Sequence, residues 1–354
     1  MGLTASQKSL YEKVRQLGSG NQAVQLTDDA CRAVLGIAAR DLGFDAHLSM
    51  DATALPELFA ANPPSTLRVD GPAPVALLED FLAAGPPDSD TYFSCLAALH
   101  KGRLKYERIL ATQPVPTLDQ VGPRGLLQYG ALPTPALTGF LFWRKWMFDI
   151  DNRAGQETGY LFEPILAAAI GGVPASAAKS PVRRRANTSK GRQVDCIRDQ
   201  TAYEFKLRVT IAASGQGRWG EELDFPQDCR ASEFTPVLVV FDPTDNPKLN
   251  ELVEAFEEAG GCAYVGDDAW GHLEDEAGYT MAAFIEKYVR SPLRDLLDVA
   301  PVGMPKLQLE MSAERVVFAV DGHESEIRRT GEDPDLASNG DDIPDDAADQ
   351  LPGV

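Results

Sequence analysis

The stretch from residue 193 to residue 209 carries the side chains best suited to chemistry. Residues 194–197 and 203–209 have the composition and alternation of two β-strands, and Asp199, Gln200 and Thr201 between them favour a turn. Alternate residues of a strand share one face, about 6–7 Å apart. Glu204 and Lys206 therefore point into the same space. If the two strands pair as a hairpin, Asp195 reaches that space as well.

Two carboxylates and a lysine at one edge of a sheet can hydrolyse a phosphodiester. Carboxylate oxygens are hard ligands that hold Mg²⁺ while leaving it water molecules and a substrate phosphate. The ion polarises the phosphate and lowers the pKa of a bound water. The lysine can orient that water or stabilise charge that develops on phosphorus. Asp195 and Glu204 are the predicted metal ligands, with Lys206 serving the attacking water.

Asp195 followed by Glu204-Phe205-Lys206 resembles the D…(D/E)xK signature of the PD-(D/E)xK nuclease superfamily, which includes most type II restriction endonucleases. The residue before Asp195 is Val194, where the signature has proline. The resemblance covers residues 157–241 and implies a mixed sheet flanked by helices. It also implies Mg²⁺ as the cofactor and double-stranded DNA as the substrate.

An acid on a preceding helix often completes the site in this superfamily. Gly159 to Ile170 is an apolar run with helical spacing that contains Glu163, and Glu157 lies one and a half turns earlier. Glu163 is the predicted accessory acid, and Glu157 is the alternative.

A simpler interpretation of the Glu-x-Lys tripeptide is the solvent face of an amphipathic edge strand. Three features favour the nuclease. An acid precedes the tripeptide on a strand, a helix acid precedes that, and the apolar strand from Pro236 to Phe241 follows.

Six basic residues and no acidic ones lie between Glu163 and Asp195. Gly, Pro, Ser and Ala surround them and predict a loop that leads directly onto the carboxylate strand. Such a loop can contact phosphates, or base edges through bidentate arginine. The alternative is a solvated basic loop or a localisation patch. The predicted DNA contacts are Lys179, Arg183, Arg184, Arg185, Lys190 and Arg192.

A second segment beside the site, Ile211 to Glu222, contains three glycines and predicts a flexible loop. Arg208, Gln216 and Arg218 are further candidate contacts to DNA. The stretch from Arg208 to Trp219 resembles the ApaLI-like group of restriction enzymes, which cut the palindrome GTGCAC. No phosphate-binding loop of the form Gly-x-x-x-x-Gly-Lys-Ser/Thr occurs, so no nucleotide cofactor is expected.

Composition and charge exclude several classes of protein. The chain of 354 residues has a formal net charge of −20, which argues against tight nonspecific coating of DNA. The first residues lack the apolar segment of a signal peptide, and no apolar run is long enough to span a membrane. Five scattered cysteines exclude a zinc-finger framework and suit a reducing environment. We therefore expect a cytoplasmic protein.

Four regions are expected along the chain. Residues 1–135 form a largely helical region that can contribute to DNA recognition, including helices capped by Thr4 and Thr27. Within it, residues 112–135 are predicted to be a loop or linker. Residues 136–300 form the α/β nuclease core, beginning with an aromatic core element at 137–150 and ending with a helix capped by Thr280. Residues 301–330 form a β-hairpin, and residues 331–354 form a disordered acidic tail.

The combined prediction is a type II restriction endonuclease that cleaves double-stranded DNA with Mg²⁺. The resemblance implies products with a 5′-phosphate and a 3′-hydroxyl, and a homodimer, because a palindromic site mirrors two-fold protein symmetry. The alternatives are a repair or recombination nuclease of the same fold and a non-catalytic DNA-binding protein. The catalytic interpretation requires Lys206, whereas the non-catalytic one does not.

Overall fold

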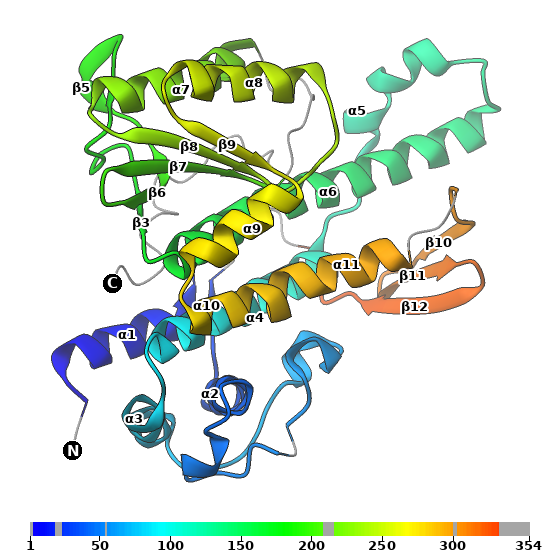
Figure 1. The fold of residues 1–354 in the computed structure, drawn as a ribbon. Helices are drawn as coiled ribbons and strands as arrows, with labels where there is room; N and C mark the ends of the chain where they lie inside the picture. Colours follow the sequence, from blue (N-terminus) through cyan, green and yellow to red (C-terminus); the bar gives the residue numbers. More distant parts are fainter. Residues whose placement is uncertain (1–2, 18–22, 54, 208–215, 300–302, 333–354) are drawn as a thin grey trace. The chain divides into compact units, whose positions relative to one another are not determined.

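The computed structural model describes residues 3–17, 23–53, 55–207, 216–299 and 303–332 (Figure 1). The chain divides into two compact units. Among the described residues, unit 1 comprises those within 3–101 and 159–295, and unit 2 comprises those within 102–158 and 296–332. The expected boundaries at residues 135 and 300 do not coincide with this division. No helix among the described residues has the length and apolar character needed to span a membrane.

Unit 1 contains a five-stranded mixed sheet with the order β3-β6-β7-β8-β9. The first three strands in this order are antiparallel, whereas β7, β8 and β9 are parallel. Parallel strands need a crossover connection, usually a helix, which the chain supplies after β7 and again after β8. The strands are β3 (Val173–Ala175), β6 (Val194–Arg198), β7 (Thr201–Lys206), β8 (Thr235–Val240) and β9 (Cys262–Val265).

Helices cover both faces of this sheet. The helices α7 (Gln216–Ala231) and α8 (Pro247–Glu258) lie side by side over one face (Figure 1), and their Phe225 and Phe256 rings stack 5.8 Å apart. On the other face, His272 of α9 (Asp267–Glu276) stacks on Tyr264 of β9 at 4.0 Å. The prediction of a mixed sheet flanked by helices is confirmed.

The first hundred residues are helical, as predicted. Thr4 and Thr27 cap the first two helices, because each side-chain hydroxyl accepts a backbone N–H bond of the first turn. Tyr92 packs edge-on against Phe284, so α10 shares the core of this helical part. The helices are α1 (Ala5–Arg15), α2 (Asp28–Asp41), α3 (Pro74–Ala84), α4 (Ser89–Thr112) and α10 (Tyr279–Ile285), and the short strands β1 (Gln16–Leu17) and β2 (Val24–Gln25) pair between α1 and α2.

Unit 2 consists of helical segments and a small antiparallel sheet. Trp146 is buried, and its ring lies 6.3 Å from that of Phe318 on the sheet. The helical segments are the end of α4, α5 (Leu118–Val121), the 3-10 helix η5 (Pro123–Gln128), the first part of α6 (Thr134–Ala169) and the end of α11 (Ser291–Asp298). The sheet consists of β10 (Leu307–Met311), β11 (Arg315–Val320) and β12 (His323–Arg328).

The sequence-based assignment of the central segments was partly wrong. Residues 112–135 are not only a loop, since they contain α5 and η5. The aromatic element at 137–150 and the helix around Glu163 form one helix, α6, that continues through Gly155, Gly159 and Pro164. Glycine and proline lower helix propensity, but tertiary packing overrides propensity over a helix of this length.

The two predicted loops near the site are also largely ordered. The basic segment contains a hairpin of β4 (Arg183–Arg184) and β5 (Asn187–Gly191). Gln216 to Glu222 belong to α7, although Gly217 and Gly220 in that helix suggested a loop. Residues 208–215, which include Arg208, lie outside the described residues.

The C-terminal part departs from the prediction in two places. A third strand, β12, follows the predicted hairpin, and it was not predicted because its sequence is polar. Asp321 and Gly322, both with positive φ, form the tight turn that leads into it. Thr280 is not a cap: Gly278 precedes α10, and the Thr280 hydroxyl donates to the Pro87 carbonyl at 2.9 Å. The predicted acidic tail lies outside the described residues from position 333 onward.

Candidate active site

The β6–β7 hairpin brings the predicted acids together. Its register pairs Cys196 with Tyr203 and Arg198 with Thr201, so a two-residue turn at Asp199 and Gln200 connects the strands. Asp199 has φ 52°, a conformation that aspartate tolerates better than most residues. By continuation of this register, Asp195 lies opposite Glu204.

Asp195 is fixed by the backbone of the neighbouring strand. Its Oδ2 accepts a hydrogen bond from the Phe205 N–H at 2.9 Å. Burial raises the pKa of the Asp195 carboxyl well above its usual value, and the charges of Glu204 and Glu163 raise it further. The bond from Phe205 and the charge of Lys206 lower this pKa, but they do not outweigh burial and the two neighbouring carboxylates.

Lys206 lies between two carboxylates from different elements. Its Nζ is 3.2 Å from Glu204 Oε1 and 3.5 Å from Glu222 Oε2 on α7. The Lys206 side chain is 17% exposed, so a water molecule or a phosphate can still reach it. Burial lowers the pKa of Lys206, but Glu204 and Glu222 outweigh that effect and raise it. The ammonium is therefore the stable form.

Glu163 on α6 completes the group, as the sequence predicted by position. Burial raises its pKa to about 7, Glu204 raises it as well, and Lys206 opposes them. Gly159, one turn earlier, leaves room for the carboxylate, since a Cβ there would lie 3.1 Å from Glu163 Oε1. Glu157 instead pairs with Lys105 at 2.8 Å within unit 2. This contact favours Glu163 as the helix acid.

The donor chemistry of this group suits a hard divalent cation. Asp195, Glu204 and Glu163 supply carboxylate oxygens. Burial and then the neighbouring carboxylates raise the pKa of Asp195 and of Glu163, and a bound cation would compensate the negative charge. Within the described residues, no three His, Cys, Asp or Glu side chains are placed so that they could hold one metal ion together. The carboxylates therefore fit a metal by type and charge.

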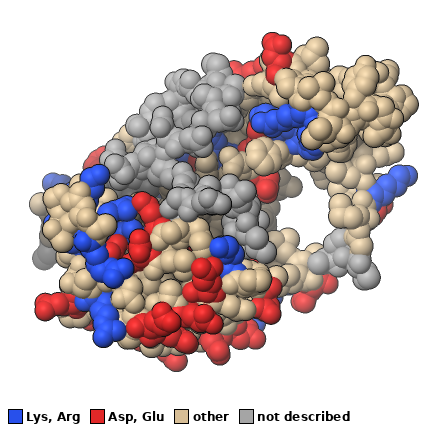
Figure 2. All heavy atoms as spheres, turned by 90° about the horizontal axis from the view of Figure 1, so that it is seen from above, with Lys and Arg blue, Asp and Glu red and all other residues tan. Residues whose placement is uncertain are grey.

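Several predicted DNA contacts form ion pairs with α7 instead of extending freely. Arg184 pairs with Glu221 at 2.9 Å, and Arg192 is buried 3.5 Å from Asp228. The guanidinium of Arg185 lies 3.6 Å from both Asp224 and Asp228. Seen from the α7–α8 side, basic and acidic side chains are interspersed on the surface (Figure 2).

The remaining predicted contacts divide into two groups. Lys179, Arg183 and Lys190 are exposed on or near the β4–β5 hairpin. Gln216 and Arg218 lie in the first turn of α7, where the backbone is described and the side chains are not.

Glu222 is the site residue that sequence reasoning missed. The apparent loop composition around it gave no reason to single out one acid. Had a helix been recognised from residue 216, both Glu221 and Glu222 would have been candidates, because they lie four and three residues before Phe225.

Comparisons with known proteins bear directly on this site. The family model described as ApaLI-like restriction endonuclease matches residues 77–290, which include all four acids and Lys206. The chain is also 52% identical, over 282 residues, to a protein named type II restriction enzyme ApaLI from Acetobacter pasteurianus. That alignment covers 74% of this chain and 75% of the relative. No solved structure matches the chain.

The chain belongs to the ApaLI-like restriction endonuclease family. As a member of this family it is a site-specific type II restriction endonuclease, which hydrolyses phosphodiester bonds of double-stranded DNA. Type II restriction enzymes generally use a divalent metal ion. The prediction of a restriction endonuclease is confirmed, and the two alternatives, a repair nuclease and a non-catalytic DNA-binding protein, are set aside.

Proposed function

We propose that the group on β6, β7 and α6 is the catalytic centre and that Mg²⁺ is its metal. The observation that carries this proposal is the convergence of Asp195, Glu204 and Glu163 around Lys206. Asp195 and Glu204 would hold the ion. When bound, the ion polarises the phosphate and acidifies a water.

The residues of the chain would act around that ion as follows. The Phe205 N–H holds the Asp195 carboxylate in a fixed direction. Lys206 Nζ donates a hydrogen bond to the attacking water or to a phosphate oxygen. Glu163, whose pKa lies near 7, can accept a proton at neutral pH. The water oxygen bonds to phosphorus and the bond to the 3′ oxygen breaks, leaving a 5′-phosphate and a 3′-hydroxyl.

DNA would be held by exposed basic side chains that lead onto this site. Lys179, Arg183 and Lys190 can neutralise phosphates, whereas Arg184, Arg185 and Arg192 fix the β4–β5 hairpin through their acidic partners. We also propose that the enzyme works as a homodimer on a palindrome, for which GTGCAC is the first candidate.

A plasmid digest with purified protein and Mg²⁺ tests the proposal. Lys206→Ala is expected to lower cleavage at least about 1,000-fold, because the charge at the reacting phosphate is lost. Lys248→Ala is the matched control, since Lys248 pairs with Glu251 on α8 and should leave cleavage unchanged.

The same digest also tests the requirement for a metal ion and defines the DNA ends of the products. Discrete fragments that vanish with EDTA and with Lys206→Ala are the expected result, and sequencing their ends gives the site and the cut position. A folded Lys206→Ala variant that cuts like the wild type would refute the assigned centre. Cleavage of a plasmid without GTGCAC would refute that recognition sequence alone.

A further inference from the structure

One face of the first part of α6 is exposed although it is largely apolar. Phe140 and Phe148 are 49% and 59% exposed, and Met147 is exposed as well. Residues three, four and seven apart share one face of a helix, so these side chains form a continuous stripe. The 140–151 stripe consists of Phe140, Trp143, Arg144, Met147, Phe148 and Asp151, and these six line one shallow groove.

The opposite face of the same helix already has its partner. Trp146 is buried and lies against Phe318, and Phe142 and Trp146 line a cavity with Leu309 and Met311 of β10. The sheet of unit 2 therefore occupies one side of α6. The apolar side chains of the 140–151 stripe have no comparable cover within the described part of unit 2.

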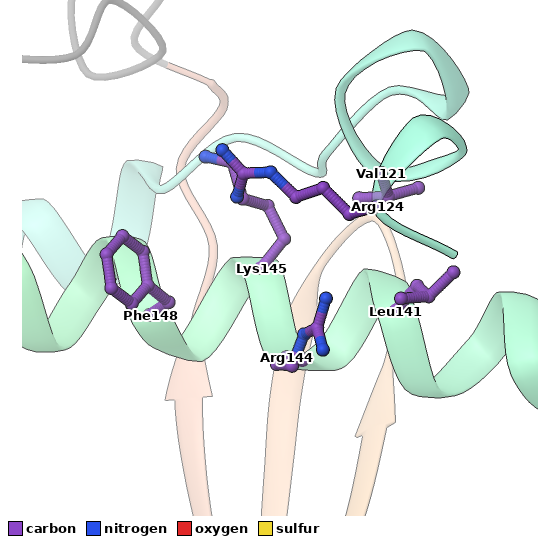
Figure 3. Close-up of a pocket in the computed structure, with 6 residues that line it drawn as sticks. All are labelled: Val121, Arg124, Leu141, Arg144, Lys145 and Phe148. Carbon is purple, nitrogen blue, oxygen red and sulfur yellow. The ribbon is translucent and has the colours of Figure 1, made fainter. Parts of the chain in front are cut away.

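Apolar exposure continues beside the stripe. Figure 3 shows Arg144 and Phe148 of α6 next to the α5–η5 segment, where Val121 and Arg124 line the same small pocket. Leu126, Leu127 and Tyr129 in and just after η5 are also exposed, Leu127 at 99%. An exposed apolar patch of this kind marks an interaction surface.

The charges of the stripe are self-complementary. Arg144 and Asp151 are seven residues apart on the same face, and neither forms an ion pair within the described residues. If two copies of α6 pack antiparallel about a two-fold axis between Met147 and Phe148, Arg144 of each copy lies level with Asp151 of the other. Met147 of each copy then meets Phe148 of the other at the centre. A two-fold interface needs such a self-complementary patch.

We propose that the 140–151 stripe is the dimerisation surface and that its occupant is the same stripe of a second copy of this chain. This inference rests on the proposed function, because a chain with one catalytic centre needs a second copy to cut both antiparallel strands of a duplex. The 140–151 stripe carries one positive and one negative side chain. The same stripe of a second copy therefore complements its charges better than DNA, which is only negative, would.

Charge reversal across the two-fold axis tests this arrangement. Arg144→Asp and Asp151→Arg should each weaken dimerisation about 10- to 100-fold, because each places two pairs of like charges in contact. Mixed in equal amounts, the two variants should form a heterodimer, since a stripe with two acids then faces a stripe with two bases. Sedimentation velocity over a range of concentrations measures both effects.

Two further variants make the result decisive. Phe148→Glu should weaken dimerisation more than about 100-fold. Tyr279→Glu, at a position 92% exposed in unit 1, should leave it unchanged. Circular dichroism and thermal melts confirm that each variant is folded.

Several outcomes would overturn the inference. One is a wild-type monomer, and another is a dimer that persists in Phe148→Glu and in both charge variants. Variants that stay dimeric but lose DNA binding would assign the stripe to DNA instead. Each of these results leaves the catalytic proposal intact, because that proposal fails only if Lys206→Ala still cuts.

Discussion

At the residue scale, the centre depends on one lysine held from two sides. Lys206 is attached to Glu204 through the strand they share, whereas Glu222 reaches it from α7. A carboxylate that binds a metal ion gives up part of its interaction with a lysine. Glu222 can then keep the ammonium in place while Glu204 serves the ion.

Glu222→Gln should therefore lower kcat about 10- to 100-fold and change KM for DNA little. Glu222 orients Lys206, and residues that orient a functional side chain typically have effects of this size. Glu221→Gln, on the same turn but paired with Arg184, is the control. In a double-mutant cycle, Glu222→Gln should have no further effect once Lys206 is alanine. An additive loss in the double variant would show that Glu222 acts independently of Lys206.

The raised pKa of Glu163 predicts a pH dependence of stability without metal. An unfolded glutamate ionises near its usual pKa of 4.5, whereas folded Glu163 keeps its proton to about pH 7. The folded state binds more protons between these values, so stability should fall as pH rises from about 4.5 to 7, by at most about 1.4 kcal/mol per pH unit from this group.

Chemical denaturation across that pH window measures this effect. Glu163→Gln cannot ionise, so its stability should fall less steeply than that of the wild type over the same range. Parallel curves for the two proteins would show that Glu163 ionises normally in the folded state.

At the element scale, the β4–β5 hairpin is anchored to α7 by one buried acid. Asp228 accepts the Arg185 N–H at 2.8 Å and lies 3.5 Å from the buried Arg192 guanidinium. Three of the predicted DNA-binding arginines thus have a structural partner on the helix that also carries Glu222. These ion pairs link the basic segment to α7, the helix whose Glu222 contacts Lys206.

Asp228→Ala should destabilise the protein by about 3–5 kcal/mol, because it leaves the buried charge of Arg192 without its partner. Asp224→Ala removes a 63% exposed partner of Arg185 and should cost less than about 1 kcal/mol. Urea unfolding of both variants measures the difference. Equal, small losses of stability in the two variants would mean that the Arg192 guanidinium contacts solvent or another acceptor when Asp228 is absent.

At the scale of the whole molecule, cutting a duplex requires two hydrolyses on antiparallel strands. The described residues of one chain contain the single centre proposed around Lys206. A dimer brings two such centres to one site, so both strands can be cut in one encounter. A monomer has to cut, dissociate and bind again in the opposite orientation.

Phe148→Glu should therefore convert a supercoiled plasmid with one site into nicked circles before linear product appears. The wild type should give linear product with little nicked intermediate. Gel analysis of a time course separates these forms, and Val75→Glu, at another exposed apolar position, controls for the added charge. Direct linearisation by a monomeric Phe148→Glu protein would contradict this expectation.

Elements and residues that depend on local pattern could be predicted from the sequence alone. Alternation defined β7, and the apolar run defined β8. The order of Glu163, Asp195, Glu204 and Lys206 along the chain was also enough to predict the family and to propose the centre, because spacing on a strand fixes which side chains share a face.

Features that depend on contacts between residues distant in sequence could be seen only in the folded chain. Packing holds α6 continuous through its glycines and proline, and folds the glycine-containing start of α7 into a helix that presents Glu222 to Lys206. The basic segment was predicted as a free loop, but Asp228, more than 30 residues later, pairs with two of its arginines. The exposed stripe on α6 became visible once the sheet had covered the opposite face, since an aromatic-rich helix alone does not show which side is buried.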